Sequence, residues 1–183
     1  VMFFTNRQQV YKCRLSDFDD SKASVLGDYL PSKLGMDPEE AVVHMVLPGD
    51  YAGALVFFFE NGKAARVDLS AYATTSNRRK LTGAYSDNSP LTALLHLKED
   101  QELALYSNEN RVLIFSTALL APKSTRTTLG VQVMTLKPKR RLEEVKILEE
   151  SGLTNPARYR CRTIPAAGAL LREEEDGAQM RLM

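Results

Sequence analysis

The fold is decided by one pattern that occurs three times: FFTNRQQVYK at residues 3–12, FFFENGKAAR at residues 57–66 and LYSNENRVL at residues 105–113. The second copy starts 54 residues after the first, and the third starts 48 residues after the second. In each copy an apolar run leads into a polar turn with Asn or Gly, and then into a second apolar or alternating run. This pattern indicates a β-hairpin whose turn contains a residue able to adopt a positive φ. We therefore expect each repeat to open with a hairpin.

The similarity continues beyond the hairpins. Each second strand leads to a hydrophobic anchor and then to a loop rich in Ser, Thr, Lys and Arg that reaches a glycine; the anchors are Phe18, Tyr72 and Leu119, and the glycines are Gly27, Gly83 and Gly130. Each repeat closes with another β-rich run, at residues 41–47, 91–97 and 142–148. Four short strands per repeat of roughly 50 residues are typical of propeller-like blades. The sequence therefore predicts an all-β fold of about three blades, each with about four strands.

The blades are predicted to occupy residues 1–150, at about 1–50, 51–100 and 101–150. An irregular C-terminal strap and a frayed tail are expected over residues 151–183, because Asn155-Pro156 interrupts the pattern. Helix is expected at most at residues 37–40 and 173–176. The alternative is a β-sandwich with hairpins at similar spacing, which the three concordant landmarks in each repeat disfavour.

The composition is that of an ordinary globular protein, with 183 residues, 44% hydrophobic and 26% charged. The longest apolar run, residues 53–59, is far shorter than the roughly 20 residues of a membrane helix. Two cysteines and two histidines without zinc-ligand spacing make a metal site improbable and favour a reducing, intracellular setting. The chain opens in mid-pattern at Val1, so we expect its N-terminus to be a cut.

The repeats resemble the blades of the C-terminal β-pinwheel domain of bacterial type IIA topoisomerase A subunits, that is, of DNA gyrase and topoisomerase IV. The resemblance rests on the hairpin residues 3–7 (FFTNR), the following Val10-Tyr11-Lys12 and the loop that ends at Gly27, and it covers residues 1–150. It implies a non-catalytic domain whose basic outer face binds and bends double-stranded DNA. Such a domain presents a duplex segment to an ATP-dependent strand-passage core and so modulates DNA topology.

The resemblance also implies a parent enzyme, an ATP-hydrolysing type II DNA topoisomerase with two A and two ATPase B subunits, in the cytoplasm at the nucleoid. Other domains of that complex would bind ATP and Mg²⁺ and carry the catalytic tyrosine, so we expect no cofactor, metal or catalytic residue here. The Gln-Arg-Arg-Gly-Gly-Lys-Gly box of gyrase is matched only in part by residues 77–83 (NRRKLTG), which lack its paired glycines. Gyrase-like and topoisomerase IV-like types are therefore not separated.

A duplex-binding face needs clustered Lys and Arg, because DNA carries a charge every 1.7 Å or so of helix axis. The net charge of +1 for the whole chain hides such a cluster: residues 1–59 carry −3, residues 75–141 carry +6 and the tail from residue 149 carries −1. We predict DNA contacts by the basic residues of three loop clusters: Arg78, Arg79 and Lys80; Lys123 and Arg126; and Lys137, Lys139, Arg140 and Arg141. The first two clusters are expected side by side on one rim. Hydroxyl and amide groups in the same loops are expected to bind phosphate oxygens: Ser76, Asn77, Ser124, Thr125, Thr127 and Thr128.

Two other functions are open to this sequence. A propeller-like protein–protein interaction module would use the acidic first repeat and the basic later repeats to hold a protein partner. A small-molecule enzyme is disfavoured, because the glycines match no phosphate-binding loop and His44 and His96 lie within strand patterns. The strand aromatics, Phe3, Phe4, Phe57, Phe58, Phe59 and Phe115, are expected in the core rather than stacked on bases.

Overall fold

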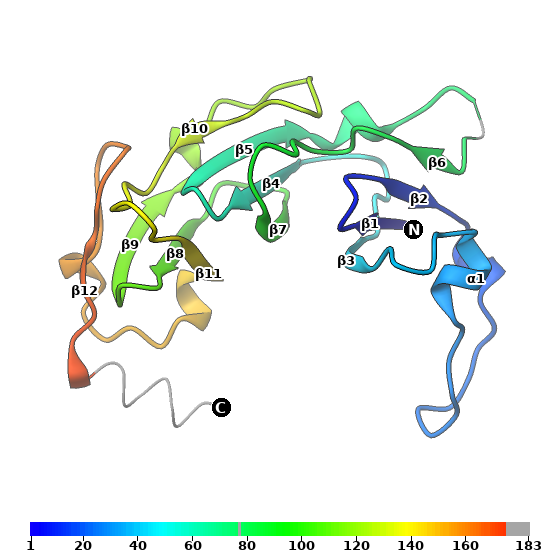
Figure 1. Cartoon of the computed structure of the whole chain (residues 1–183), viewed down its shortest axis with the longest axis horizontal. Helices are drawn as coiled ribbons and strands as arrows, with labels where there is room; N and C mark the ends of the chain where they lie inside the picture. Colours follow the sequence, from blue (N-terminus) through cyan, green and yellow to red (C-terminus); the bar gives the residue numbers. More distant parts are fainter. Residues whose placement is uncertain (77, 175–183) are drawn as a thin grey trace.

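The computed structural model describes residues 1–76 and 78–174 and shows three four-stranded antiparallel sheets along an open arch (Figure 1). Blade 1 has the strand order β3–β1–β2–β6, with bounds Val42–Val46, Met2–Thr5, Val10–Lys12 and Lys80–Leu81. Blade 2 has the order β10–β5–β4–β7, with bounds Val131–Gln132, Lys63–Asp68, Ala54–Phe59 and Leu91–Leu97. Blade 3 has the order β11–β8–β9–β12, with bounds Leu142–Ile147, Glu102–Ser107, Arg111–Ser116 and Ala169–Leu170. The predicted all-β, four-strand blades are confirmed.

The three hairpins are equivalent residue by residue. Strands β1 and β2, β4 and β5, and β8 and β9 pair directly across their turns. Each turn holds one residue in the left-handed region at the same position of the repeat: Gln8 (φ 54°), Gly62 (φ 82°) and Asn110 (φ 56°). The backbone carbonyl of each of these residues accepts a hydrogen bond from a later segment of the chain, donated by Ala84, by Val133 and Met134, and by Leu171. The 54- and 48-residue periods of the sequence are therefore structural periods.

Each sheet takes its fourth strand from further along the chain. β6 belongs to the second repeat but pairs with β2 of the first, and β10 belongs to the third repeat but pairs with β5 of the second. In blade 3 the same place is filled by β12, from the C-terminal segment, which pairs with β9. Figure 1 shows the three exchanged strands on the convex side of the arch, with β3, β7 and β11 on the concave side. The sequence pattern did not predict this exchange.

The central strand of blade 2 is buried on both of its faces. All six residues of β4 are buried, with Leu55, Phe57 and Phe59 packed in the cluster shared with blade 1, and Val56 and Phe58 in the cluster shared with blade 3. The Phe57 ring centroid lies 6.0 Å from that of Phe4, and the Phe58 centroid lies 6.1 Å from that of Phe115. Because successive side chains point to opposite faces, one strand joins two cores. The prediction that these aromatics are core residues is confirmed.

The two ends of the arch are covered by irregular segments. On blade 3 the outward face, with Tyr106 and Ile114, is covered by the C-terminal segment through Tyr159. On blade 1 the segment between β2 and β3 lies against Phe3, and its Phe18 ring centroid is 5.9 Å from the Phe3 ring. That segment contains the 3-10 turn Leu15–Asp17 and the helix α1, Leu30–Leu34. None of the helices among the described residues is long and apolar enough to cross a membrane.

The helix prediction was wrong for the first repeat. Residues 37–40 form a turn, and α1 lies instead at Leu30–Leu34, where Pro31 occupies the first turn and Gly35 ends the helix with a φ of 67°. Proline fits the first turn and a left-handed glycine fits the position after the last, so these two signals outweigh the acidic residues at 37–40. Further 3-10 turns follow β5 at Leu69–Tyr72, β9 at Thr117–Leu119 and β11 at Leu148–Glu150. Another lies in the C-terminal segment at Pro156–Arg158. The tail at residues 175–183 lies outside the described residues.

A basic side chain at the end of β5 connects blades 2 and 3. The Arg66 guanidinium donates to Asp100 Oδ1 at 2.7 Å and to the carbonyl oxygens of Thr117 and Leu120. The position equivalent to Arg66 in blade 1 is Lys12, whose ammonium donates to the carbonyl of Tyr72. The residue equivalent to Tyr72 is the buried Leu120, so the third hydrophobic anchor is Leu120 and not Leu119, which is 40% exposed. The same contact therefore occurs at both junctions: a cation of the second hairpin strand donates to carbonyls in or directly after the 3-10 turn of the next repeat.

We expect Gly130→Ala to lower the free energy of unfolding by about 1–3 kcal/mol, because a left-handed φ is costly for residues with a Cβ. Gly130 has a φ of 75°, and a Cβ there would lie 2.2 Å from the carbonyl oxygen of Ala64, beside the exchanged strand β10. The matched control is Gly27→Ala: no atom lies within 4 Å of its Cβ position, and its φ is not left-handed. Urea unfolding of both variants is the measurement. Equal losses of stability would contradict the role assigned to Gly130.

We expect Asp100→Asn to destabilise the protein near neutral pH and to lose that effect in acid. The hydrogen bond from Arg66, aided by one from Thr117, holds the pKa of the Asp100 carboxyl below its usual value. A group with a lowered folded-state pKa stabilises above its unfolded pKa, and this contribution disappears as the pH falls through the folded pKa. Urea unfolding of both proteins from neutral pH to below about 4 should therefore show the difference shrinking. A constant difference would show that the charge of Asp100 is not what stabilises the junction.

Candidate nucleic-acid interface

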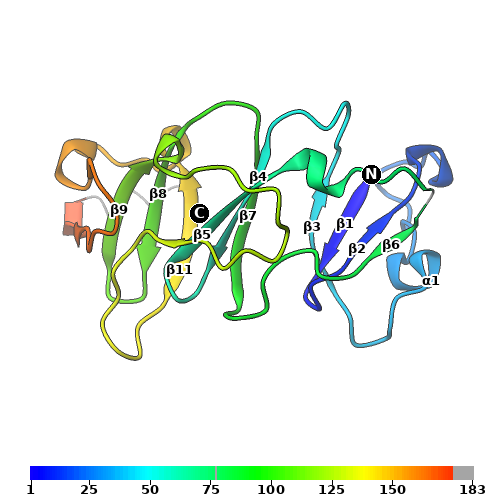
Figure 2. The same ribbon diagram turned by 90° about the horizontal axis from the view of Figure 1, so that it is seen from above.

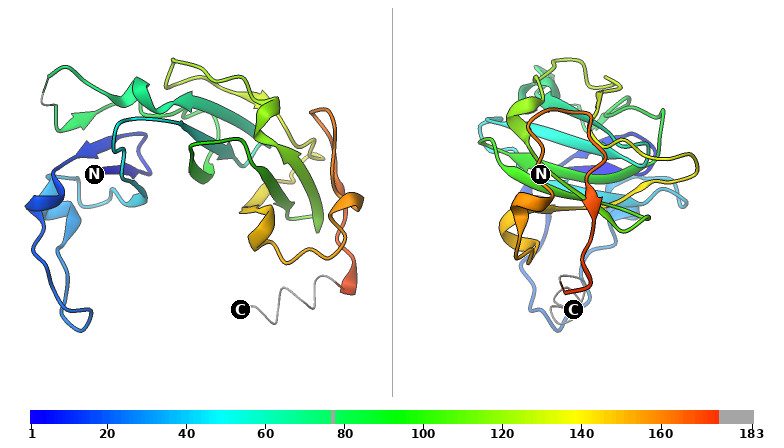
Figure 3. Two further views of the ribbon diagram at one scale, coloured as in Figure 1. Left: turned by 180° about the vertical axis from the view of Figure 1, so that it is seen from behind. Right: turned by 90° about the vertical axis from the view of Figure 1, so that its left-hand side faces the viewer.

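Two chain segments lie on the convex side of the arch and carry the first two predicted clusters (Figures 1 and 2). We call residues 73–76 and 78–83, which contain β6, arm 2, and residues 120–132, which contain β10, arm 3. Each arm leaves the second strand of its own hairpin and adds a strand to the preceding blade, as the view from behind also shows (Figure 3). Basic residues in the arms are therefore placed on the outer side of the arch by the same backbone pairing that completes the sheets.

Arm 2 places its three basic residues over blade 1. Arg78, Arg79 and Lys80 are all exposed. The Arg79 carbonyl accepts a hydrogen bond from the backbone N–H of Lys12, and Lys80 pairs with Tyr11 in the β2–β6 ladder. The Lys80 ammonium lies 5.5 Å from the centre of the Tyr11 ring. Asn77, which we also expected to contact phosphate, lies outside the described residues.

Arm 3 lies against the base of arm 2. Arg126 is partly buried; its guanidinium donates to the Ala71 carbonyl at 3.3 Å and lies 6.0 Å from the centre of the Tyr72 ring. A hollow of about 370 Å³ between the arms is lined by Ala71, Thr82, Gly83, Ser124, Thr125, Arg126 and Thr127. The structure thus brings the first two clusters onto neighbouring segments.

The sequence alignment of the two arms that matched Gly83 with Gly130 is not the register that the structure shows. Leu81 pairs with Val10 and Val131 pairs with Ala64, which are equivalent hairpin positions. Gly130 is therefore equivalent to Lys80, and Gly83 lies three residues further along. The reason is that strand pairing, and not the loop landmark, sets the register.

The third cluster lies elsewhere, at the hairpin end of blade 3. The Arg141 backbone N–H donates to Asn108 Oδ1 at 3.1 Å, which fixes the loop to the β8–β9 turn. The Glu109 carboxylate, only 14% exposed, lies 3.8 Å from the Lys137 ammonium and 3.6 Å from the Arg140 guanidinium. Arg141 faces Glu143 at 3.8 Å, whereas Lys139 has no ion pair in the described part of the chain. Sequence analysis grouped this cluster with the others but did not predict its internal carboxylate partners.

The first hairpin has the same arrangement with the opposite charges. Arg7 is equivalent to Glu109, and its guanidinium lies 3.4 Å from Asp37 and 3.3 Å from Glu39. The Ala41 N–H donates to Asn6 Oδ1 at 2.9 Å, as the Arg141 N–H does to Asn108. The hairpin edge of the arch is therefore acidic at blade 1 and basic at blade 3.

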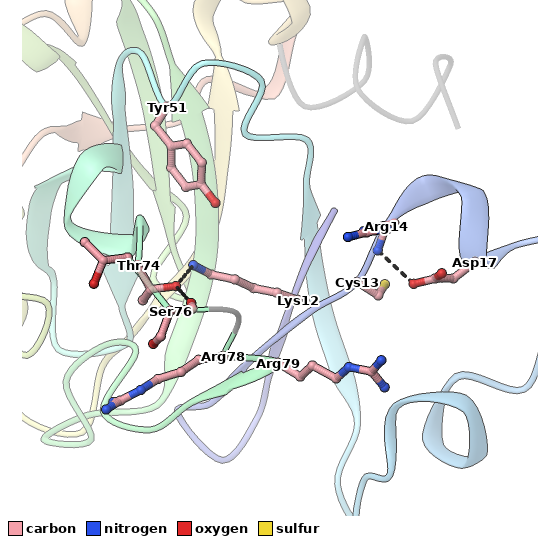
Figure 4. A pocket seen from close by; sticks show the side chains of 10 residues that line it. Lys12, Cys13, Arg14, Asp17, Tyr51, Thr74, Ser76, Arg78 and Arg79 are labelled. Carbon is pink, nitrogen blue, oxygen red and sulfur yellow. Dashed lines mark hydrogen bonds between the residues drawn. The ribbon is translucent and has the colours of Figure 1, made fainter.

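Two basic residues that sequence analysis missed face arm 2 from blade 1. A cavity of about 540 Å³ separates the end of β2 from arm 2 and is lined by Lys12, Cys13, Arg14, Asp17, Tyr51, Thr74, Thr75, Ser76, Arg78 and Arg79 (Figure 4). We call it the junction pocket. Counting charge by region hid Lys12 and Arg14, because they lie in the acidic first repeat. The signal for Lys12 was its equivalence with Arg66 in the next repeat.

The charges of the junction pocket influence one another. Burial lowers the pKa of the Lys12 ammonium, and the positive charge of Arg126 lowers it further. The Lys12 ammonium donates to the carbonyl of Tyr72 and, at 3.4 Å, to Thr74 Oγ1. Burial also raises the pKa of the Cys13 thiol, which leaves it neutral and without an anion to offer Lys12. The pocket is therefore a net positive site, lined by four cations and one carboxylate, that of Asp17.

The comparisons with known proteins agree with the resemblance that the repeats suggested. No model of a known protein family matches the chain. The chain is 25% identical over 154 residues to the DNA gyrase A protein of Mycobacterium bovis (strain BCG / Pasteur 1173P2), a match that covers 82% of this chain and 18% of that protein. The chain is homologous to part of the gyrase A protein. The gyrase A protein of Staphylococcus aureus (strain NCTC 8325 / PS 47) is 22% identical over 140 residues, 75% of this chain and 16% of that protein. The chain thus spans less than a fifth of the length of these gyrase relatives.

Solved structures show the same fold. The C-terminal domain of DNA topoisomerase IV superposes with a TM-score of 0.69 at 19% identity, covering 82% of this chain and 47% of that domain. The E. coli ParC C-terminal domain superposes with a TM-score of 0.68 at 14% identity, covering 94% of this chain and 76% of that domain. The fold is therefore the β-pinwheel of the gyrase and topoisomerase IV C-terminal domains, as the repeats predicted.

Proposed function

We propose that this chain is the DNA-binding and DNA-bending part of a type IIA topoisomerase A protein. The observation that carries the proposal is that strand exchange puts both basic arms on the convex side of the arch, where Thr82 and Gly83 of arm 2 and residues 124–127 of arm 3 line one hollow. Homology to the gyrase A protein supports it. A convex basic surface attracts the backbone of a duplex and favours its bending, since each phosphate contact releases counterions.

The contacts available on the arms are of the kind that position DNA without reading bases. Guanidinium and ammonium groups bind phosphates through charge, and Ser124, Thr125 and Thr127 line the hollow between the arms with hydroxyl groups. Neither arm contains an aromatic residue that could stack on a base. Binding is therefore expected to tolerate many sequences and to prefer those that bend easily.

The remaining features of the proposal concern the parent protein. The duplex held here would be delivered to a strand-passage core in other parts of the A protein, with ATP and Mg²⁺ bound by other domains and the gyrase B protein serving as the ATPase partner. Within the parent complex the domain would act in the cytoplasm, at the nucleoid. The support for these points is the homology alone, and it extends over 18% of the length of the Mycobacterium bovis relative.

The proposal is tested with the triple variant Arg78→Glu, Arg79→Glu, Arg126→Glu and a duplex of about 40 base pairs bearing a fluorophore. We expect weaker binding and a flatter dependence of log K on log salt, by roughly 0.9 for each phosphate that is no longer neutralised. The matched control reverses three exposed cations outside the arms, Lys22, Lys98 and Arg162, with the same change in net charge. If both triple variants are weakened to the same degree, or if the parent chain binds no duplex, the proposal fails.

The third cluster has its own test. If Lys137 and Arg140 contact phosphates, Glu109→Gln should strengthen duplex binding about two- to fivefold, because their carboxylate partner no longer competes with DNA. The control is Glu99→Gln, an exposed carboxylate without an ion pair in the described chain. Fluorescence anisotropy at fixed salt gives both affinities. Equal affinities for the two variants would remove the cluster at residues 137–141 from the DNA surface.

A further inference from the structure

The two junctions between blades have equivalent cations, but only one of these cations forms an ion pair with a carboxylate of the chain itself. At the junction of blades 2 and 3, the Arg66 guanidinium has the Asp100 carboxylate as its partner at 2.7 Å. At the junction of blades 1 and 2, Lys12 takes the place of Arg66, and Ala52, 48 residues before Asp100, takes the place of the carboxylate. No ion pair of Lys12 exists within the described chain. The repeat therefore leaves a cation without its counter-ion.

Lys12 lines the junction pocket together with Tyr51, the neighbour of Ala52, and with further positive charge. Arg14 from blade 1 and Arg78 and Arg79 from arm 2 line the junction pocket with Lys12, and none of them has an ion pair in the described part of the protein. The one carboxylate in the pocket, Asp17, already accepts the backbone N–H of Arg14 at 2.9 Å. With four cations against one engaged carboxylate, the junction pocket carries a net positive charge.

The pocket also offers neutral donors and enough room. Its lining includes the hydroxyl groups of Tyr51, Thr74 and Ser76, and Figure 4 shows the Tyr51 hydroxyl directed toward the same space as the Lys12 ammonium. Hydroxyl donors beside cations are the usual surroundings of a phosphate oxygen. A volume of about 540 Å³ is more than a phosphate group needs.

We propose that the junction pocket is a seat for a phosphate of the duplex backbone, formed only where blade 1 and arm 2 meet. The proposal rests on the proposed function, since the phosphate is supplied by the DNA held on arms 2 and 3. It extends the DNA surface onto the first repeat, through Lys12 and Arg14, although that repeat is acidic in total. A phosphate bound there contacts two blades at once and so stabilises their junction.

The most direct test is a substitution that introduces a carboxylate at the position equivalent to Asp100. Ala52→Asp introduces an acid at the repeat position of Asp100, next in sequence to Tyr51 of the junction pocket, and Ala52→Asn is its isosteric neutral control. Ala52 is exposed and its backbone contacts do not involve its side chain. We expect Ala52→Asp to weaken duplex binding roughly five- to tenfold near 0.1 M salt and to flatten the salt dependence by about 0.9, while Ala52→Asn binds as the parent chain does. Urea unfolding should show that neither variant is less stable than the parent.

A second variant reaches the pocket from its other side. Arg14→Glu should weaken duplex binding by a similar factor, whereas Lys22→Glu, with the same charge change on an exposed loop of the same repeat, should have a much smaller effect. Suppose that the parent chain binds and the arm variants bind weakly, but that Ala52→Asp equals Ala52→Asn and Arg14→Glu equals Lys22→Glu. That result would overturn the seat and leave the proposed function standing. Absence of binding by the parent chain would overturn the proposed function itself.

Inorganic phosphate separates the two sources of a phosphate group. Thermal unfolding is followed with phosphate or chloride at matched ionic strength, and a duplex is then added. We expect the duplex to raise the melting temperature of the parent chain more than that of Ala52→Asp, and millimolar phosphate to have little effect on either. A phosphate-specific rise in the parent that Ala52→Asp abolishes, with unchanged duplex affinity, would assign the pocket to a free phosphate ligand and overturn its assignment to DNA.

Discussion

The structure depends on strands that are apolar on both faces. A sheet of this kind has to be covered on each side, and here the cover is the next sheet, so that β4 belongs to two cores and the blades stack in a row. Stacking alone would leave the outer edge of every hairpin with unpaired backbone groups. The exchanged strands β6, β10 and β12 fill these edges. Because each exchanged strand comes from the following part of the chain, blades are connected by hydrogen bonds as well as by packing.

This architecture explains why the candidate binding residues have structural contacts too. An arm that crosses to the preceding blade exposes its outer side, and its cations also contact tyrosine rings through their charged groups: Lys80 lies over Tyr11 and the partly buried Arg126 over Tyr72. Long basic side chains commonly cover apolar surface in this way. The arms thus hold positive charge at fixed positions, which suits a bent, stiff polyanion better than charge on mobile loops would.

The sequence was sufficient for the hairpins, their turns and their periods, because strand alternation and left-handed turn residues are local properties. It was insufficient for the origin of the fourth strands, since β6, β10 and β12 are two residues long and their partners are distant in the chain. Charge counted along the chain found arms 2 and 3 but missed Lys12 and Arg14, which enter the same site from an acidic repeat. Helix α1 was missed because it is only five residues long, so its proline and glycine signals looked like those of a loop.

Repeats give a way to separate charges that hold the fold from charges that are available to a ligand. At one pair of equivalent positions, Arg7 and Glu109, the charge changes sign, and the charge of its partner changes with it: Arg7 pairs with Asp37, and Glu109 pairs with Lys137. The repeat therefore keeps the ion pair itself, whose role is to hold the loop to the hairpin. At the junction of blades 1 and 2, by contrast, Lys12 keeps the positive charge of Arg66, whereas Ala52 replaces the carboxylate of Asp100. Here the repeat keeps only the cation. A half-buried ammonium costs free energy that a nearby anion would offset. The proposed duplex phosphate would offset this cost at the junction of blades 1 and 2, which is the behaviour of a binding site and not of a structural contact.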